Sequence, residues 1–525
     1  MLEERVSATM REDLWMMKMN MDERLGYSTL LTHGNNAQDI SSVPTFDANE
    51  LHLGPLLGVG GFCAVSEIQA IKLKKGNVMT DSNNAPYGKN HPSRTESVAT
   101  SQTTFPCSDI EDTDESNEPP SASEITQSSR VEMSLFAIRK GDARYAIKKI
   151  KDEIYDFARA IDDNDDEKFS SAFARMEARK KRDKFMSATL DLAVEAQYLA
   201  ALSHPNLIKM RGVASCDPFS GNYFLILDRL YGTLDDKIQE WKNRIKSSGI
   251  GCIGKNKEDI KDIWLERLNA SYGLAAALKH LHSHKIVYRD LKPENSGFDV
   301  RGDIKLFDLG LATELYPHLE VEEGLYQLTG HTGSLRYMAP EVRWSELYNL
   351  RADVYSYGLV FWQICALKRP FENYTREKVD RKVLKEGIRP KSQRSWFRRT
   401  AWYDMMQQLW AHDQADRPEF TTVCEWLASE IDIVSGDDID GESTMKRLET
   451  RRSLNSIYAR TASSSGRSSG GTGGMWRSLI RSKSSTERNS ASSRSSRGFG
   501  LGLMGSSFFK SSAASIKPSA KAGGD

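Results

Sequence analysis

The sequence predicts an α+β fold that contains both strands and helices, with segments between and after them that do not pack. Alternating side chains in "RYAIKKI" predict a strand. Apolar residues at helical spacing in "DLAVEAQYLAALSHP" predict a helix that stops at the His-Pro pair. The longest apolar run, "YGLVFWQICAL", is too short to span a bilayer and is typical of a helix buried in a large domain.

The composition excludes several classes of protein. Lys plus Arg and Asp plus Glu are equal at 72 each, so the overall charge indicates neither nucleic acid nor membrane as a partner. The 6 cysteines form no C-x-x-C pair, which argues against a zinc site or a disulfide framework. The first residues are interrupted by charges and offer no signal-peptide core. We expect no transmembrane segment and a cytoplasmic location, with the nucleus as the alternative.

Changes in composition divide the chain. Residues 1–50 form a partly disordered leader, and residues 51–433 form one domain. Within that domain, 74–131 is an acidic, Ser/Thr-rich insertion that cannot bury enough apolar area to order itself. Residues 151–185 alternate acidic and basic blocks and predict an exposed helical insertion. Residues 436–525 form a disordered tail rich in Ser, Gly and Arg.

The tail is strongly basic. From residue 446 to residue 525 it holds 15 Lys or Arg against 3 Asp or Glu, a net charge of +12. It lacks the interleaved aromatic residues that bind single-stranded nucleic acid, so no specific nucleic acid is expected. We interpret it as a solvated linker, with docking or autoregulation as the second interpretation. Phosphorylation motifs occur at Ser463 and Ser484, and at Ser108 in the acidic insertion.

The strongest chemical signal is "IVYRDLKPENSGF", which contains Asp290, Lys292 and Asn295, followed by Asp308 in "IKLFDLGLA". Phosphoryl transfer requires mainly positioning and charge neutralisation. One carboxylate must orient the incoming hydroxyl, while a second carboxylate and an amide hold Mg²⁺ against the nucleotide phosphates. These residue types, in this order, fit those three tasks.

The two segments resemble the catalytic loop and the metal-binding motif of the protein kinase family. The resemblance implies that Asp290 is the catalytic base, that Lys292 contacts the transferring phosphate, and that Asn295 and Asp308 bind Mg²⁺, with Mn²⁺ as a substitute. Tyr288 replaces the usual His and Leu309 the usual Phe. Both positions usually serve packing, so we do not expect either change to disable the protein.

The resemblance extends from about Leu53 to Ile433. It implies the two-lobed kinase fold, with an antiparallel strand-rich N-lobe, a helical C-lobe and ATP between them. In "RYAIKKI" it makes Lys148 the residue that reaches the α- and β-phosphates, and Glu195 on the following helix its partner. Leu227 is expected to be the gatekeeper that precedes the hinge.

The glycine-rich stretch "LLGVGGFCAV" resembles the phosphate loop, with Cys63 in place of the third glycine. Cys63 is therefore a candidate for a modifiable thiol near the nucleotide. The full set expected to bind ATP is Leu57, Gly58, Val59, Gly60, Gly61, Val65, Ala146, Lys148, Asp228 and Leu230.

Three further residues are expected to hold the C-lobe together. "TGSLRYMAPE" resembles the end of an activation segment, in which Glu341 forms a buried ion pair with Arg417. Asp353 is expected to anchor the backbone of the catalytic loop, although its position alone also fits a helix cap.

Regulation is predicted at the activation segment. Arg289 precedes the catalytic aspartate and supplies the cation that usually receives a phosphate there. Thr329 and Thr332 are the candidate phosphorylation sites, and a segment that is stable without phosphate is the alternative.

We therefore expect an ATP-dependent protein serine/threonine kinase in signalling, most similar to the tyrosine-kinase-like group. Lys292 in "DLKPEN" and Ser334 in "TGSLRY" favour serine/threonine specificity. The main alternative is a pseudokinase scaffold that binds partners without efficient transfer. A small-molecule phosphotransferase is a more distant alternative, because the A-P-E segment is typical of protein substrates.

Overall fold

A computed structural model describes most of the chain between residues 8 and 436. The described residues are 8–28, 30–31, 40–74, 122–139, 141–154, 172–247, 257–392 and 400–436. The tail with its two phosphorylation motifs and the acidic part of the insertion with Ser108 lie outside the described residues, so those predictions stay predictions.

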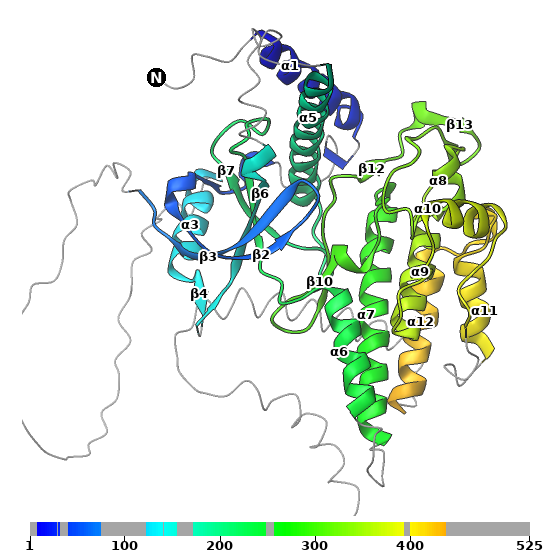
Figure 1. Ribbon diagram of the computed structural model, residues 1–525. Coiled ribbons are helices and arrows are strands. Elements are labelled where there is room, and N and C mark those ends of the chain that lie inside the picture. The colour runs from blue at the N-terminus through cyan, green and yellow to red at the C-terminus, as the bar shows by residue number, and fades with distance from the viewer. Residues whose placement is uncertain are drawn as a thin grey trace, which may run out of the picture. The chain divides into compact units, whose positions relative to one another are not determined.

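A six-stranded sheet forms the N-terminal lobe (Figure 1). Its strands are β1 (Thr45–Phe46), β2 (Leu51–Val59), β3 (Cys63–Ile71), β6 (Tyr145–Ile150), β7 (Met210–Ala214) and β8 (Phe224–Asp228). Their order is β1-β7-β8-β6-β3-β2, and every pair is antiparallel except β1 with β7. This lobe also holds the helices α1 (Ala8–Leu25), α3 (Ala122–Leu135) and α5 (Ala172–Ala201), and the hairpin of β4 (Ile138–Arg139) and β5 (Asp142–Ala143).

The C-terminal lobe is mainly helical, and α6, α7, α9 and α12 lie side by side in Figure 1. Its helices are α6 (Leu234–Ser247), α7 (Lys257–Ser283), α8 (Pro340–Trp344), α9 (Arg351–Ala366), α10 (Arg376–Lys378), α11 (Thr400–Leu409) and α12 (Phe420–Ser435). Its strands are the short β9 (Ile286–Val287), β10 (Ser296–Phe298), β11 (Ile304–Leu306), β12 (Thr313–Glu314), β13 (Glu320–Glu322) and β14 (Leu325–Tyr326). This architecture confirms the expected α+β fold of two lobes.

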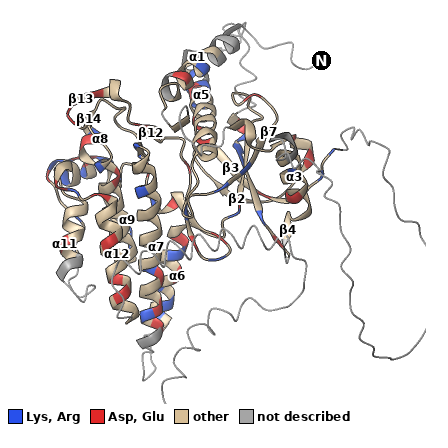
Figure 2. Cartoon of the chain, turned by 180° about the vertical axis from the view of Figure 1, so that it is seen from behind, with Lys and Arg blue, Asp and Glu red and all other residues tan. Residues whose placement is uncertain are grey.

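The apolar run of "YGLVFWQICAL" lies in α9, and every residue from Ala352 to Cys365 is buried. This confirms a helix inside the domain. Among the described helices, none combines the length and the apolar character needed to cross a membrane. Lys and Arg alternate with Asp and Glu along several helices in Figure 2, as expected for helices with a solvated face.

The leader contributes to the sheet, which corrects the expected domain start at residue 51. Strand β1 runs parallel to β7, and the amides of Val213 and Ser215 donate to the carbonyls of Pro44 and Phe46. The Phe46 ring is 1% exposed. Strand β1 has only two residues, which is too short to show the alternating pattern of a strand in the sequence. This edge strand of the sheet was therefore not predicted.

The predicted disorder of 74–131 is wrong for its last part, because α3 begins at Ala122. Met133 is buried against the sheet, and the guanidinium of Arg130 donates to both oxygens of the buried Glu50 carboxylate, at 2.9 and 3.0 Å. A buried carboxylate is stable only when it is paired, so this ion pair ties the helix to the fold.

The predicted helical insertion at 151–185 is also corrected. Residues 172–185 are helical, but they continue without a break into the helix that carries Glu195, so α5 is one helix of 30 residues. The first turns are exposed, and burial begins at Phe185. Residues 172–185 are therefore an N-terminal extension of this helix rather than a separate element, and residues 155–171 lie outside the described residues.

Cys63 begins β3, where it pairs with Ile150 of β6. Burial raises the pKa of its thiol to about 11, and the nearby carboxylates of Glu195 and Asp308 add to the effect while Lys148 opposes it. Since the thiolate is the reactive form, the expectation of a modifiable thiol is not supported by this environment.

We predict that alkylation of Cys63 by iodoacetamide is slow at neutral pH and that its rate keeps rising up to about pH 10, because this whole range lies below the thiol pKa of about 11. Peptide mapping after timed labelling measures this rate, and the exposed Cys216 provides an internal comparison. A rate for Cys63 that levels off below pH 8 would contradict the assignment.

Candidate active site

Lys148 lies where three elements converge. It projects from β6, whose neighbours are β3 and β8. Its ammonium group is 2.5 Å from Oε2 of Glu195 on α5 and 2.8 Å from Oδ1 of Asp308, which follows β11. The side chains of Lys148 and Glu195 are 12% and 1% exposed, whereas that of Asp308 is 43% exposed. The pair is thus buried while one carboxylate remains open to a ligand.

Electrostatics favour the charged forms of Lys148 and Asp308, whereas burial raises the pKa of Glu195. Burial by itself would lower the pKa of Lys148, but the carboxylates of Asp308 and Glu195 outweigh burial and raise it above the ordinary lysine value. The positive charge of Lys148 lowers the pKa of Asp308. At neutral pH, Lys148 is therefore a cation and Asp308 an anion, which are the states needed to bind a phosphate and a metal ion.

The backbone after Asp308 approaches α5 closely. Asp308 itself has a φ of 65°, in the left-handed region. A β-carbon at Gly310 would lie 2.9 Å from the β-carbon of Asp191 and 3.1 Å from its carbonyl oxygen. Because only glycine fits there, the Asp-Leu-Gly motif and α5 are in direct contact.

Asp353 holds the backbone that leads to the catalytic loop. Its Oδ2 accepts from the amide of Tyr288 and its Oδ1 from the amide of Arg289, both at 2.8 Å. The ring of His282 also lies 2.9 Å from Oδ2. Arg289 has a φ of 71°, so these hydrogen bonds stabilise a strained turn. The geometry fits an anchor for the loop better than a simple helix cap.

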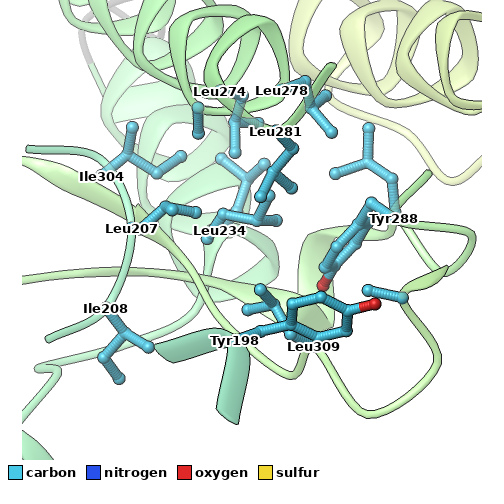
Figure 3. Close-up of a cluster of buried hydrophobic side chains, with 14 of the residues drawn as sticks. Tyr198, Leu207, Ile208, Leu234, Leu274, Leu278, Leu281, Tyr288, Ile304 and Leu309 are labelled. Atoms are coloured by element: carbon cyan, nitrogen blue, oxygen red, sulfur yellow. The ribbon is translucent and has the colours of Figure 1, made fainter. Parts of the chain in front are cut away.

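The two substitutions in the catalytic motifs lie in the core, and Figure 3 shows both among the apolar side chains. Tyr288 and Leu309 are each 0% exposed. The Tyr288 hydroxyl also donates to the carbonyl of Phe307 at 2.5 Å, and burial raises the pKa of Tyr288 so that it keeps its proton. Sequence reasoning expected the packing but missed this hydrogen bond, although a Tyr in place of His retains a donor.

Asp290 is surrounded by donors on one side. Its Oδ2 accepts from Lys292 Nζ at 2.5 Å and from Asn295 Nδ2 at 3.0 Å. Its Oδ1 is buried and has no hydrogen-bond partner among the described residues. Lys292 Nζ also donates to Ser334 Oγ at 3.1 Å. Oδ1 of Asp290 therefore has the capacity to accept a further hydrogen bond.

Asp308 and Asn295 could bind a metal ion. Asn295 donates through its amide nitrogen to the Asp290 carbonyl and carboxylate, which leaves its side-chain oxygen as the atom able to bind a cation. Across the described residues, no group of three or more His, Cys, Asp or Glu could form a site made of protein ligands alone. The arrangement therefore suits Mg²⁺ or a similar ion completed by phosphate oxygens and water.

The expected nucleotide loop is the turn between β2 and β3. Gly58 pairs with Val65, and the amide of Gly60 donates to the Cys63 carbonyl at 2.8 Å. A β-carbon at Gly58 or Gly61 would meet nothing within 4 Å. The loop is therefore open above the strands. Leu57 and Val59 are 38% and 58% exposed.

The expected hinge follows β8. Ala146 of β6 pairs with Leu227, and both are buried. Both carboxylate oxygens of Asp228 accept from the guanidinium of Arg211, at 2.7 and 2.8 Å. The Asp228 side chain is therefore engaged in an ion pair and is not a free carboxylate for a ligand. Within the described chain, no backbone hydrogen bond from the Leu230 amide is found outside the helices and strands, so its expected contact with the adenine base stays a prediction. The Arg211 contact was not expected from the sequence.

The activation segment connects to the catalytic loop through Arg289. Its Nη1 donates to the Thr329 hydroxyl at 2.6 Å, and its Nε donates to the Leu311 carbonyl at 2.6 Å. Tyr348 donates to the carbonyl of Thr329 at 2.8 Å. Thr332 instead bonds within its own turn. Of the two candidate phosphorylation sites, the structure brings Thr329 to Arg289.

The end of the segment is held by a buried ion pair. Arg417, 1% exposed, donates to Oε1 and Oε2 of Glu341 at 2.5 and 2.9 Å. The same guanidinium donates to three backbone carbonyls, those of Ala411, Arg351 and His412. All of its donors are thereby used, which is what a buried charge requires.

Comparison with known proteins agrees with this geometry. A family model described as the protein kinase domain matches residues 157–427. Serine/threonine-protein kinase STY46 of Arabidopsis thaliana is 32% identical over 154 residues, which are 29% of this chain and 25% of that protein. Serine/threonine-protein kinase STY17 of the same plant is 30% identical over 171 residues, which are 33% of this chain and 28% of that protein.

Another relative is ribosomal protein S6 kinase alpha-1 of Homo sapiens, 32% identical over 195 residues, which are 37% of this chain and 23% of that protein. The chain spans about a quarter of the length of these curated relatives. Because the family model covers more than half of the sequence and the described fold carries the motifs in order, this chain belongs to the protein kinase family.

Proposed function

We propose that the chain is an active protein kinase that transfers the γ-phosphate of ATP to Ser or Thr hydroxyls of protein substrates. One observation carries the proposal: Lys148 contacts Glu195 and Asp308 at the same time, while Asp290 keeps an unpaired acceptor oxygen nearby. A scaffold without catalytic activity does not require these charged groups to be held in this arrangement.

Each residue has a role in the proposed reaction. Lys148, oriented by Glu195, binds the α- and β-phosphates. Asp308 and Asn295 would hold a divalent ion, which would neutralise phosphate charge. The incoming hydroxyl donates to Oδ1 of Asp290, and its oxygen forms the new bond to the γ-phosphorus as the bond to the leaving ADP oxygen breaks. Asp290 accepts the hydroxyl proton as that bond forms.

Several features support a protein substrate with Ser or Thr at the acceptor position. Lys292 joins Asp290 to Ser334, so the catalytic loop and the end of the activation segment form one hydrogen-bonded surface. The names of the relatives STY46 and STY17 describe serine/threonine kinases. Membership of the tyrosine-kinase-like group and a cytoplasmic or nuclear location belong to the same proposal.

A degenerate peptide library with γ-labelled ATP tests the proposal. We expect the full chain to label peptides at Ser or Thr, and Asp308→Asn to lower transfer by at least about a hundredfold, because the metal loses its carboxylate. Asp303→Asn is the matched control, since this aspartate is paired with Arg301 outside the site.

Three results would contradict parts of this proposal. Substantial transfer by Asp308→Asn would refute the metal assignment. Absence of transfer by the wild-type chain would favour the scaffold, and labelling of Tyr alone would refute the substrate class. Thermal unfolding of each variant, expected within a few degrees of wild type, excludes misfolding as the cause.

We also propose that phosphorylation of Thr329 activates the enzyme, because its hydroxyl already lies on Arg289 and a phosphate there would form a stronger, charge-assisted contact. Mass spectrometry of the active protein should find phosphate at Thr329, and Thr329→Ala should lower transfer more than Thr332→Ala. The proposal fails if neither threonine carries phosphate, or if the Thr329→Ala/Thr332→Ala double variant keeps full activity.

A further inference from the structure

The N-terminal segment of residues 17–31 contacts both the helix of Glu195 and the chain that follows Asp308. Its first part lies on α5, as Figure 1 shows for α1. Met17 is 2% exposed and packs with Ala193 of α5 and Phe219. Since Ala193 lies two positions before Glu195, this contact supports the part of the helix that carries the ion pair.

The second part of the segment reaches the start of the activation segment. Ser28 is 0% exposed, and its hydroxyl donates to Oε2 of Glu314 in β12 at 2.6 Å. The same hydroxyl accepts from the amide of Leu31 at 3.2 Å, which fixes its orientation. Glu314 is 1% exposed. A hydrogen bond from a hydroxyl to a buried carboxylate is directional, unlike an apolar contact. Removing the hydroxyl is costly because the carboxylate stays buried with one donor fewer.

Aromatic and apolar contacts extend this junction. The Tyr27 ring packs against His318 and Tyr316, with ring centroids 4.5 and 6.1 Å apart. Leu25 and Leu30 are buried in the main core on either side of Ser28. The hydrogen bond is therefore enclosed by apolar groups, which exclude water and strengthen it.

Strand β12 in turn lies beside the catalytic loop. Glu314 pairs with Ile286 of β9, and the Leu315 amide donates to the Lys285 carbonyl at 2.8 Å. Strand β9 leads directly to Tyr288 and Asp290. On the other side, Gly310 is in contact with Asp191 of α5. Residues 17–31 thus contact α5, which supplies Glu195, and β12, which follows Asp308 in the chain and pairs with the strand that precedes Asp290.

We propose that residues 17–31 act as a brace that fixes β12 relative to α5, with Ser28 and Glu314 as positioning residues for the arrangement of Lys148, Glu195 and Asp308. Without the Ser28 hydroxyl, the Glu314 carboxylate loses a buried donor, and β12 relaxes toward water. Asp308 then spends less time at Lys148. The kinetic consequence rests on the proposed kinase activity, whereas the structural consequence does not.

Two measurements on the full chain test the brace. Hydrogen exchange followed by mass spectrometry should show faster exchange at residues 309–319 and 190–199 in Ser28→Ala. Steady-state kinetics should show kcat lowered about three- to tenfold, with KM for the peptide within about twofold, because positioning acts on the transition state more than on substrate binding.

A double-mutant cycle identifies the pair. Glu314→Ala should match Ser28→Ala, and the double variant should lose about as much kcat as the worse single variant, because both remove one interaction. Glu314→Gln retains an oxygen acceptor for Ser28 and should keep most of kcat. Ser271→Ala is the matched control, since Ser271 is a buried serine of α7 whose hydroxyl bonds within its own helix.

The brace is refuted if Ser28→Ala leaves exchange at 309–319 and 190–199 unchanged, or speeds exchange no more than Ser271→Ala does. Additive losses in the cycle, or a Glu314→Gln variant as impaired as Glu314→Ala, would also refute it. If the wild-type chain transfers no phosphate, the proposed function fails, and the exchange measurement alone decides on the brace.

Discussion

The ammonium group of Lys148 lies between two carboxylates from separate elements, and the rest of the site depends on this contact. Glu195 is 1% exposed, so its charge is stable in the core only while Lys148 is beside it. That condition fixes α5 against the sheet. Asp308 adds a second negative charge, which keeps Lys148 protonated and brings the backbone of Gly310 against α5. One cation therefore orders three elements.

The catalytic loop is ordered by a second buried carboxylate. Asp353 accepts two backbone amides and thereby stabilises the positive φ of Arg289, so that Arg289 can reach Thr329 while Asp290 faces the site. Tyr288 connects the loop to the carbonyl of Phe307, next to Asp308. The Tyr288 phenol is thus one of the links between the two carboxylate clusters, and the replacement of His by Tyr preserves both the packing and a donor.

The candidate site residues could be located from the sequence because charged residues in "RDLKPEN" and "FDLG" occur at spacings with a chemical meaning; their catalytic roles stay predictions. The buried helix α9 could be predicted because its apolar run has no other stable location. Helix α3 could not be predicted, because the sequence around it is rich in Ser and Thr. Its attachment to the fold depends on the ion pair of Arg130 with Glu50, which is distant in the sequence. The same holds for Ser28 and Glu314, and for Cys63, whose thiol pKa is raised mainly by burial.

Single-turnover transfer from γ-labelled ATP by Glu195→Gln tests the central claim that Lys148 is held in place by Glu195. The account predicts a rate at least about tenfold below wild type, because a neutral amide holds the ammonium group less firmly. Glu177→Gln, on the same helix but at an exposed pair with Lys180, should leave the rate unchanged. A wild-type rate in Glu195→Gln would contradict the account.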